Sequence, residues 1–124
     1  MKILYFVIVV SAFLVGCKSE YSNRQLAGRW VAISLTEENV AVAADLSQVW
    51  MEFTEKGGYK FHSTLNIVEE GRFRLHRKLL VRQNVAVPDE PEKAVELVWV
   101  HRDSMMIGMR EGEKTRLLTM KRSK

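Results

Sequence analysis

The chain has 124 residues, 47% of them hydrophobic and 27% charged, and a formal net charge of +4. This length fits one domain and is too short for two. Its 19 basic residues are spread among 15 acidic ones, without the dense basic stripe or aromatic interleaving typical of nucleic-acid binding. We therefore expect no nucleic-acid partner.

The first residues have the layout of a secretory signal. Met1 and Lys2 give a short basic start, and a run that is apolar apart from Ser11 extends from Ile3 to Val15. A run of this length matches the hydrophobic region of a signal peptide, whereas a transmembrane helix needs ~20 apolar residues. The pattern predicts export.

The run ends in Leu14-Val15-Gly16-Cys17, which contains the single cysteine of the chain. These four residues resemble the lipobox of bacterial lipoproteins. The resemblance implies cleavage before Cys17, a lipid on its thiol and acylation (palmitate) of the new amino terminus. Two or three acyl chains anchor a protein stably. An uncleaved membrane anchor and a buried free cysteine are the alternatives.

This resemblance predicts a signal peptide over residues 1–16, a lipidated amino terminus and polar tether over 17–25, and a domain over 26–124. At ~3.3 Å per residue the spacer Lys18–Gln25 reaches at most ~26 Å. The expected location is the cell envelope, with the membrane as partner through the lipid. Lys18 stands where an aspartate would signal inner-membrane retention in enteric bacteria, so the outer membrane is expected.

The domain opens with Leu26, Gly28 and Trp30, leading into a predicted strand over Arg29–Leu35. This opening resembles the Leu-x-Gly-x-Trp turn of lipocalin-like domains. In those domains the glycine lets the backbone bend and the tryptophan plugs the closed end of a barrel. After this strand, Val40–Leu46 predicts either one or two helical turns or a loop across the barrel mouth.

From Val49 onward, short alternating segments are separated by turn residues. The predicted strands are Val49–Thr54, Tyr59–Leu65, Arg72–His76, Lys78–Gln83, Ala94–His101, Met105–Arg110 and Thr115–Lys121. The predicted turns include Glu55–Gly58, Glu69–Gly71 and the acidic loop Pro88–Glu92.

With the opening strand, the segments predict an all-β fold with an eight-stranded up-and-down antiparallel barrel. Closure removes unpaired sheet edges, and a barrel of eight strands is just wide enough to be filled by side chains or to hold one small ligand. An open, strongly bent sheet and a small sandwich are the alternatives.

Catalytic and metal-binding patterns are missing from the sequence. His62, His76 and His101 lack the spacing of metal ligands, and no Gly-x-Ser-x-Gly elbow surrounds a serine. We therefore expect a protein without enzymatic activity, bound metal or cofactor.

Alternation predicts the inward face. Its members are Trp30, Met51, Phe53, Tyr59, Phe61, Phe73, Leu75, Leu79, Val81, Leu97, Trp99, Ile107, Met109, Leu118 and Met120. Either they fill the barrel or some of them line a pocket for a small hydrophobic ligand. The candidate ligand-binding residues are Trp30, Phe53, Tyr59, Phe61, Phe73, Trp99 and Met109.

A second functional hypothesis uses the outer surface. Trp50, Val98 and Val100 are predicted to point outward, where an apolar patch would bind a protein partner or another copy. The competing functions are thus a membrane-anchored ligand-binding lipoprotein and an interaction lipoprotein with a filled barrel.

Overall fold

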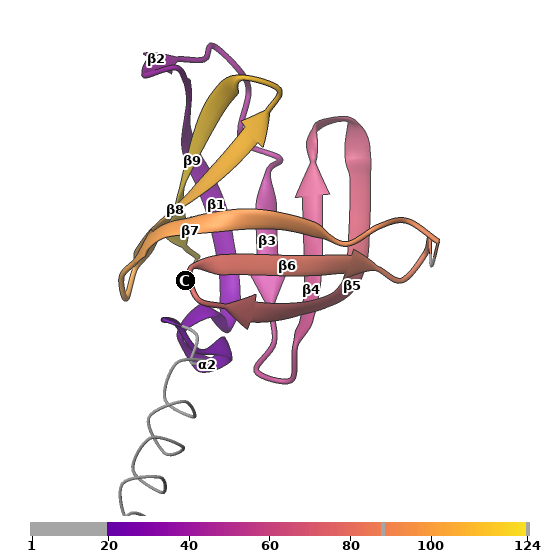
Figure 1. Cartoon of the computed structure of the whole chain (residues 1–124). Helices are drawn as coiled ribbons and strands as arrows, with labels where there is room; N and C mark the ends of the chain where they lie inside the picture. Colours follow the sequence, from indigo (N-terminus) through magenta and orange to yellow (C-terminus); the bar gives the residue numbers. More distant parts are fainter. Residues whose placement is uncertain (1–19, 88, 124) are drawn as a thin grey trace, which may run out of the picture.

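The computed structural model describes residues 20–87 and 89–123. In this part of the chain nine strands form one antiparallel sheet in the order β2-β1-β3-β4-β5-β6-β7-β8-β9, and β1 also pairs with β9 (Figure 1). The strands are β1 (Gly28–Glu37), β2 (Val40–Ala41), β3 (Trp50–Phe53), β4 (Gly58–Ser63), β5 (Ile67–His76), β6 (Leu79–Asn84), β7 (Lys93–Val100), β8 (Ser104–Glu111) and β9 (Lys114–Arg122).

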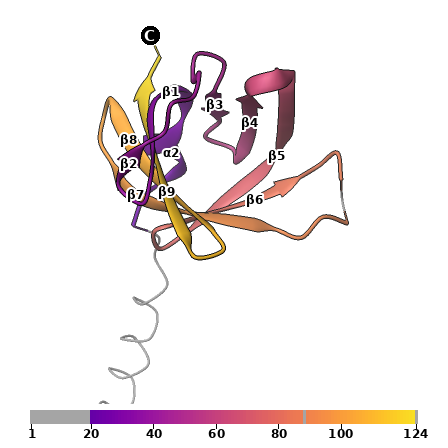
Figure 2. The same ribbon diagram turned by 90° about the horizontal axis from the view of Figure 1, so that it is seen from above.

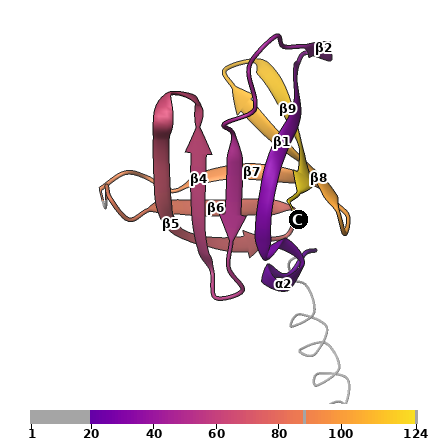
Figure 3. The same cartoon turned by 180° about the vertical axis from the view of Figure 1, so that it is seen from behind.

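The predicted eight-stranded up-and-down barrel is confirmed. The β1–β9 pairing runs from Trp30 opposite Arg122 to Glu37 opposite Arg116, so the sheet closes on itself (Figure 2). Figure 3 shows β1, β3, β4 and β5 side by side in one wall, with β6 and β7 crossing behind them. This closure excludes the open sheet and the sandwich, and β2 is a short extension paired with the end of β1.

One end of the barrel is covered by the helix α2 (Asn23–Leu26) (Figure 1). Ser22 caps this helix, because its side chain accepts from the Gln25 backbone while the Gln25 side chain accepts from the Ser22 backbone. Such a capping box satisfies two amide groups that the helix leaves open. Asn23–Gln25, in the segment predicted as a polar tether, therefore belong to this helix. The predicted signal segment, cleavage site and Cys17 lie outside the described residues.

The segment Val40–Leu46 forms the strand β2 and then an irregular loop. The helical alternative for it was wrong. The Val42 amide donates to the Leu35 carbonyl, which holds the loop against β1. The loop alternative, at the mouth of the barrel, is the one observed.

The predicted turn at Glu69–Gly71 was also wrong, because β5 runs through it without interruption. Gly71 is needed for close approach: a Cβ atom there would lie 2.0 Å from the Gln83 carbonyl oxygen on β6. The chain instead reverses at the 3-10 turn η1 (Thr64–Asn66), where Asn66 has φ 58°. Asparagine tolerates this left-handed conformation better than most residues.

On two strands, β6 and β7, the residues that point into the barrel are not the predicted ones. On β6, Leu80 is fully buried and Leu79 is 39% exposed, because the tight turn after His76 pairs Leu79 with that residue. On β7, the register shifts between Leu97 and Trp99. Such a bulge reverses the alternation.

As a result of the bulge, Val100 packs on the core and Trp99 does not belong to the core cluster. Val81 is also outside this cluster, because it shares the face of Leu79 on β6. The predicted inward positions of Leu79, Val81 and Trp99 and the outward position of Val100 were therefore wrong. Leu26, Leu80 and Met105 belong to the core although alternation did not predict them.

The hydrophobic core fills the half of the barrel next to α2. Its buried members are Leu26, Trp30, Met51, Phe53, Tyr59, Phe73, Leu80, Leu97, Met105, Ile107, Leu118 and Met120. Phe61, Leu75 and Met109 are half-buried and pack against this cluster.

Candidate functional site

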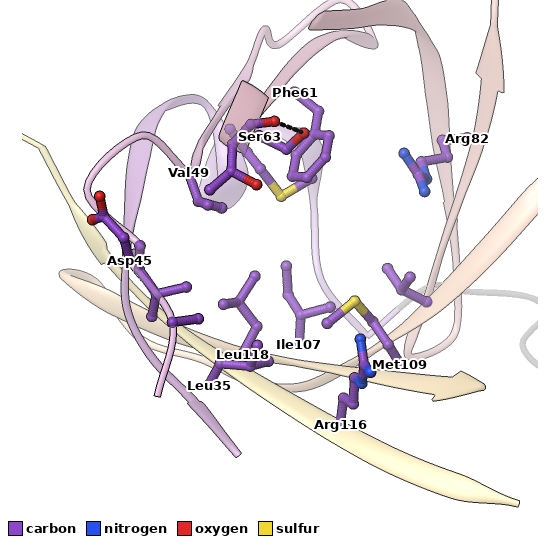
Figure 4. A pocket seen from close by; sticks show the side chains of 15 residues that line it. Leu35, Asp45, Val49, Phe61, Ser63, Arg82, Ile107, Met109, Arg116 and Leu118 are labelled. Atoms are coloured by element: carbon purple, nitrogen blue, oxygen red, sulfur yellow. Dashed lines mark hydrogen bonds between the residues drawn. The ribbon is translucent and has the colours of Figure 1, made fainter. Parts of the chain in front are cut away.

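A cavity of about 340 Å³ lies in the half of the barrel away from α2. It is lined by Leu35, Ala44, Asp45, Leu46, Val49, Met51, Phe61, Ser63, Thr64, Arg82, Val95, Ile107, Met109, Arg116 and Leu118 (Figure 4). Most of these side chains are apolar. The barrel is therefore filled at one end and hollow at the other, so each of the two alternatives for its interior describes one half.

Local irregularities shape this hollow. A register shift between Ala32 and Ser34 in β1 changes the alternation, so that Leu35 lines the cavity. The loop after β2 then contributes Ala44 and Leu46 at the mouth. This loop therefore forms part of the rim of the cavity.

The seven candidate ligand-binding residues divide into three groups. Phe61 and Met109 line the cavity. Trp30, Phe53, Tyr59 and Phe73 are buried in the packed half, outside the cavity lining. Trp99 lies outside the core, with its ring 4.8 Å from that of His101.

The methionines follow the same division. Met51 and Met109 line the cavity, whereas Met105 and Met120 are fully buried in the packed half. Thioether side chains adjust easily to irregular shapes. Two adaptable side chains therefore face the hollow, on β3 and β8.

A polar network forms part of the wall at β4, β5 and β6. The Tyr59 hydroxyl donates to the Glu69 carboxylate at 3.0 Å, and the Arg82 guanidinium donates to the same carboxylate. Burial, and then the hydrogen bond to Glu69, raise the pKa of Tyr59 well above its ordinary value. A neutral phenol, a carboxylate and a guanidinium thus satisfy one another in a largely apolar interior.

A second ion pair lies on the opposite wall. Arg116 of β9 lines the cavity, and its Nη2 atom is 3.8 Å from Glu37 Oε2 on β1. Lys114 Nζ contacts the other Glu37 oxygen at 3.4 Å from the exposed side.

Sequence reasoning missed both of the arginines that line the cavity. Counting in steps of two from buried Phe73 and Leu80 would have placed Glu69 and Arg82 inward. The wrong phase of β6 hid this signal for Arg82, whereas steps of two from the predicted inward residue Leu118 place Arg116 inward.

The outer residues Trp50 and Val98 are half-buried. The Trp50 ring stacks on His62 at 5.3 Å and carries the Arg29 guanidinium at 4.0 Å. Neighbouring polar side chains thus cover part of the surface predicted to be an apolar patch.

Within residues 20–87 and 89–123, no three side chains of the His, Cys, Asp and Glu types gather as a metal site would require. In the same part of the chain, no helix has both the length and the apolar character needed to cross a bilayer.

The closed end is held by Trp30 and Arg122. The indole Nε1 of Trp30 donates to the Leu26 carbonyl at 2.9 Å, and the Arg122 guanidinium stacks on the indole at 4.2 Å. Gly28, with φ 121°, makes room for this stacking, because a Cβ atom there would lie 2.7 Å from the Arg122 side chain. Gly28 therefore gives the backbone a conformation that favours glycine, and Trp30 plugs the closed end, as the Gly-x-Trp opening predicts.

Comparison with known proteins supports the same fold. No family model matches the sequence, and neither does any curated protein. The crystal structure of a lipocalin-like protein from Bacteroides uniformis is similar, with a TM-score of 0.57 and 14% sequence identity over 76% of this chain and 96% of that one. Together with the closed eight-stranded barrel, this similarity shows that the chain has a lipocalin-like fold.

Proposed function

We propose that this protein is a membrane-anchored bacterial lipoprotein that binds a small, largely apolar ligand in the open half of its barrel and catalyses no reaction. The observation that supports ligand binding is the cavity itself. Its volume of about 340 Å³ falls within the ~300–1,000 Å³ of small-molecule sites. Its lining is mostly apolar, with a few polar groups at fixed positions.

The anchor is supported by the Leu14–Cys17 motif and by the position of the domain's first described residue. The Glu20 amide donates to the Arg77 carbonyl in the turn between β5 and β6, beside α2. Only Lys18 and Ser19 separate Glu20 from Cys17. A lipid on Cys17 would hold the plugged end toward the bilayer and leave the mouth facing away from it.

Ligand binding is tested with the domain from Lys18 onward, which contains the nine described strands and the described hydrophobic core. The fluorescence of N-phenyl-1-naphthylamine, an apolar probe, should rise and saturate on binding. Ala44→Trp places an indole at the mouth and should abolish the rise. Ala43→Trp is the matched control, because Ala43 is exposed and does not line the cavity. Equal responses from the two variants would exclude the cavity as the site.

The anchor is tested separately in a bacterial host. An alkyne-bearing fatty acid fed to the cells should label the wild-type protein and not Cys17→Ala. The variant should also leave the membrane fraction. Equal labelling of the two proteins would contradict lipidation at Cys17 without bearing on the cavity.

A second candidate function is binding of a protein partner on the outer surface. It is favoured by exposed aliphatic side chains in and near β5, where Ile67 and Val68 are each 57% exposed and Val85 is 56% exposed. A photo-crosslinking residue at position 68 should then capture a protein in cells that the same residue at exposed position 74 does not. Equal capture at both positions would count against this function.

A further inference from the structure

We infer that the closed end of the barrel docks on an anionic phospholipid surface, whose phosphate groups enter a basic hollow formed by Arg24, Arg102 and Arg122. This inference rests on the proposed lipid anchor, which brings the closed end to the bilayer, and it names the surface that the domain then contacts. It does not depend on the cavity inside the barrel.

The basic hollow lies beside α2, at the end of the barrel away from the cavity. Its volume is about 470 Å³, and its lining consists of Arg24, Gln25, Val100, His101, Arg102 and Arg122. These residues come from α2, from the turn between β7 and β8, and from the end of β9, which meet at the closed end (Figure 1). The lining contains three arginines, and none of its described residues is acidic.

Arg122 holds the segments that form the hollow close together. Its Nη2 atom donates to the Gln25 carbonyl at 2.8 Å, and its Nε atom donates to the Arg102 carbonyl at 2.9 Å. Because both nitrogens belong to one planar group, the backbone at Gln25 and the backbone at Arg102 lie on either side of a single guanidinium. Arg24 precedes Gln25 directly. The three positive charges therefore surround one hollow.

The charges of this hollow are not balanced by carboxylates. Among the described residues, none of the three arginines forms an ion pair. Arg122 donates to the backbone carbonyls of Ala27, Gln25 and Arg102, which leaves its charge in place and part of its five N–H donors free. Arg24 and Arg102 are exposed. An anion that enters the hollow thus meets donors without competition from a glutamate.

The turns of the barrel carry opposite charge at its two ends. Since consecutive strands are antiparallel, alternate connections lie at opposite ends. The connections at the closed end are residues 54–57, 77–78 and 101–103, and their charged residues are Lys56, Arg77, Lys78 and Arg102 against Glu55 and Asp103. The connections at the mouth are residues 38–49, 64–66, 85–92 and 112–113, and their charged residues are Glu38, Asp45, Asp89, Glu90, Glu92 and Glu113. A negatively charged surface therefore attracts the closed end and repels the mouth.

The anchor brings the closed end within range of the head groups. Glu20 is hydrogen-bonded to the turn at Arg77, and three residues separate its position from that of Cys17 along the chain. Three residues span at most ~11 Å. The attraction of an anionic bilayer for basic residues falls off within a screening length, which is ~8 Å at physiological ionic strength. A lipid on Cys17 thus places the hollow where head-group charge acts.

The phosphate group of a phospholipid is the anion that these side chains fit. A guanidinium matches two phosphate oxygens with a forked pair of hydrogen bonds. Arg24 and Arg102 are exposed at the rim, so they can reach a phosphate at the membrane surface without extraction of the lipid. Docking would then fix the orientation of the barrel, with its mouth directed away from the bilayer.

The test measures binding of the domain from Lys18 onward to sedimenting vesicles at low ionic strength. The vesicles contain phosphatidylcholine alone or an equimolar mixture with phosphatidylglycerol. We expect binding to the mixture and not to phosphatidylcholine alone. Equal binding to the two kinds of vesicle, or binding to neither, would overturn the inference.

Variants locate the surface that binds. Arg102→Gln and Arg24→Gln should each weaken binding to the mixed vesicles by about fivefold, and the double variant by about 25-fold. Arg110→Gln is the matched control, because Arg102 and Arg110 are exposed near opposite ends of β8 and their replacement changes the net charge equally. It should weaken binding by less than about twofold. Equal weakening by Arg102→Gln and Arg110→Gln would show that net charge alone drives binding and would overturn the proposed site.

Free phosphate is the alternative occupant of the hollow. Inorganic phosphate should release no more protein from the mixed vesicles than chloride at equal ionic strength. Selective release by phosphate would indicate a site for a soluble ion and would contradict docking on the membrane. Because the tested domain lacks Cys17, its vesicle binding can fail while fatty-acid labelling of Cys17 succeeds, and the reverse. Failure of the docking surface and failure of the anchor are therefore distinguishable.

Discussion

Replacement of Arg122 tests how the closed end of the barrel is held together. Its Nε atom donates to the Arg102 carbonyl at 2.9 Å, Nη2 donates to the Gln25 carbonyl at 2.8 Å, and Nη1 donates to the Ala27 carbonyl. The same guanidinium stacks on Trp30. One side chain thus connects the end of β9 to the segment before β1 and to the turn between β7 and β8.

The expected loss follows from these contacts. A hydrogen bond from a charged donor contributes ~1.5–3 kcal/mol, and a cation–π contact contributes ~0.5–2 kcal/mol. Because Arg122 is half-buried, water replaces part of what is lost. We therefore expect Arg122→Ala to lower the free energy of unfolding by about 3 kcal/mol. For a domain of ~100 residues this lowers Tm by at least ~12 °C.

The assay is urea and thermal unfolding, followed by circular dichroism, of the domain from Lys18 onward. Arg122→Lys keeps the charge but lacks the planar fork, so it should recover less than half of the loss. Arg110→Ala, on the exposed face of β8, is the control and should stay within ~0.5 kcal/mol of wild type. If Arg122→Ala is equally harmless, the plug does not depend on this residue.

Three further changes test other parts of the fold. Gly71→Ala should prevent normal pairing of β5 with β6, because of the 2.0 Å approach of a carbonyl oxygen, and should leave little folded protein in solution by circular dichroism. Leu80→Ala should lower the free energy of unfolding by ~2–5 kcal/mol, whereas Leu79→Ala should change it by less than ~1 kcal/mol; comparable losses in urea unfolding would contradict the observed phase of β6. Because burial raises the pKa of Tyr59 above its ordinary 10.0, its neutral form should add stability that is present below pH 10 and is lost as pH rises further. Urea unfolding of Tyr59→Phe should lack that part of the alkaline loss.

The overall fold could be predicted from the sequence because local signals agreed with the closed topology. Trp30 lies near the start of a strand that follows a glycine, and segments such as Tyr59–His62 and Arg72–His76 alternate between apolar and polar residues. Eight such segments joined mainly by short turns have few ways to bury one apolar face without leaving edges. Burial of Trp30, Phe53, Phe73 and other predicted core residues followed from this pattern.

The errors occurred where backbone contacts between strands override local pattern. Gly71 resembles a turn residue in sequence, but its role is close approach to β6. The bulge in β7 moves Trp99 outward and Val100 inward, and only its pairing with β8 reveals this shift. The phase of β6 was ambiguous because Leu79 and Leu80 are equally apolar.

The cavity was harder to predict than the core, because its lining depends on which residues of each strand point inward. Arg82 lines it, and the wrong phase of β6 turned this residue outward in the prediction. Whether large side chains fill a barrel depends on how far each extends toward the axis, which the sequence pattern does not specify. The packed half contains Trp30, Phe53 and Phe73. The half with the cavity is lined in part by smaller residues such as Val49 and Val95.

The most direct test of the central claim is the methionine methyl NMR spectrum of the domain during titration with decanoate. Occupancy of the cavity should shift the resonances of Met51 and Met109, which line it, more than that of Met106, which alternates outward on β8 between buried neighbours. The shifts should saturate with the ligand. Unchanged Met51 and Met109 signals at saturating decanoate, or equal shifts at Met106, would contradict ligand binding inside the barrel.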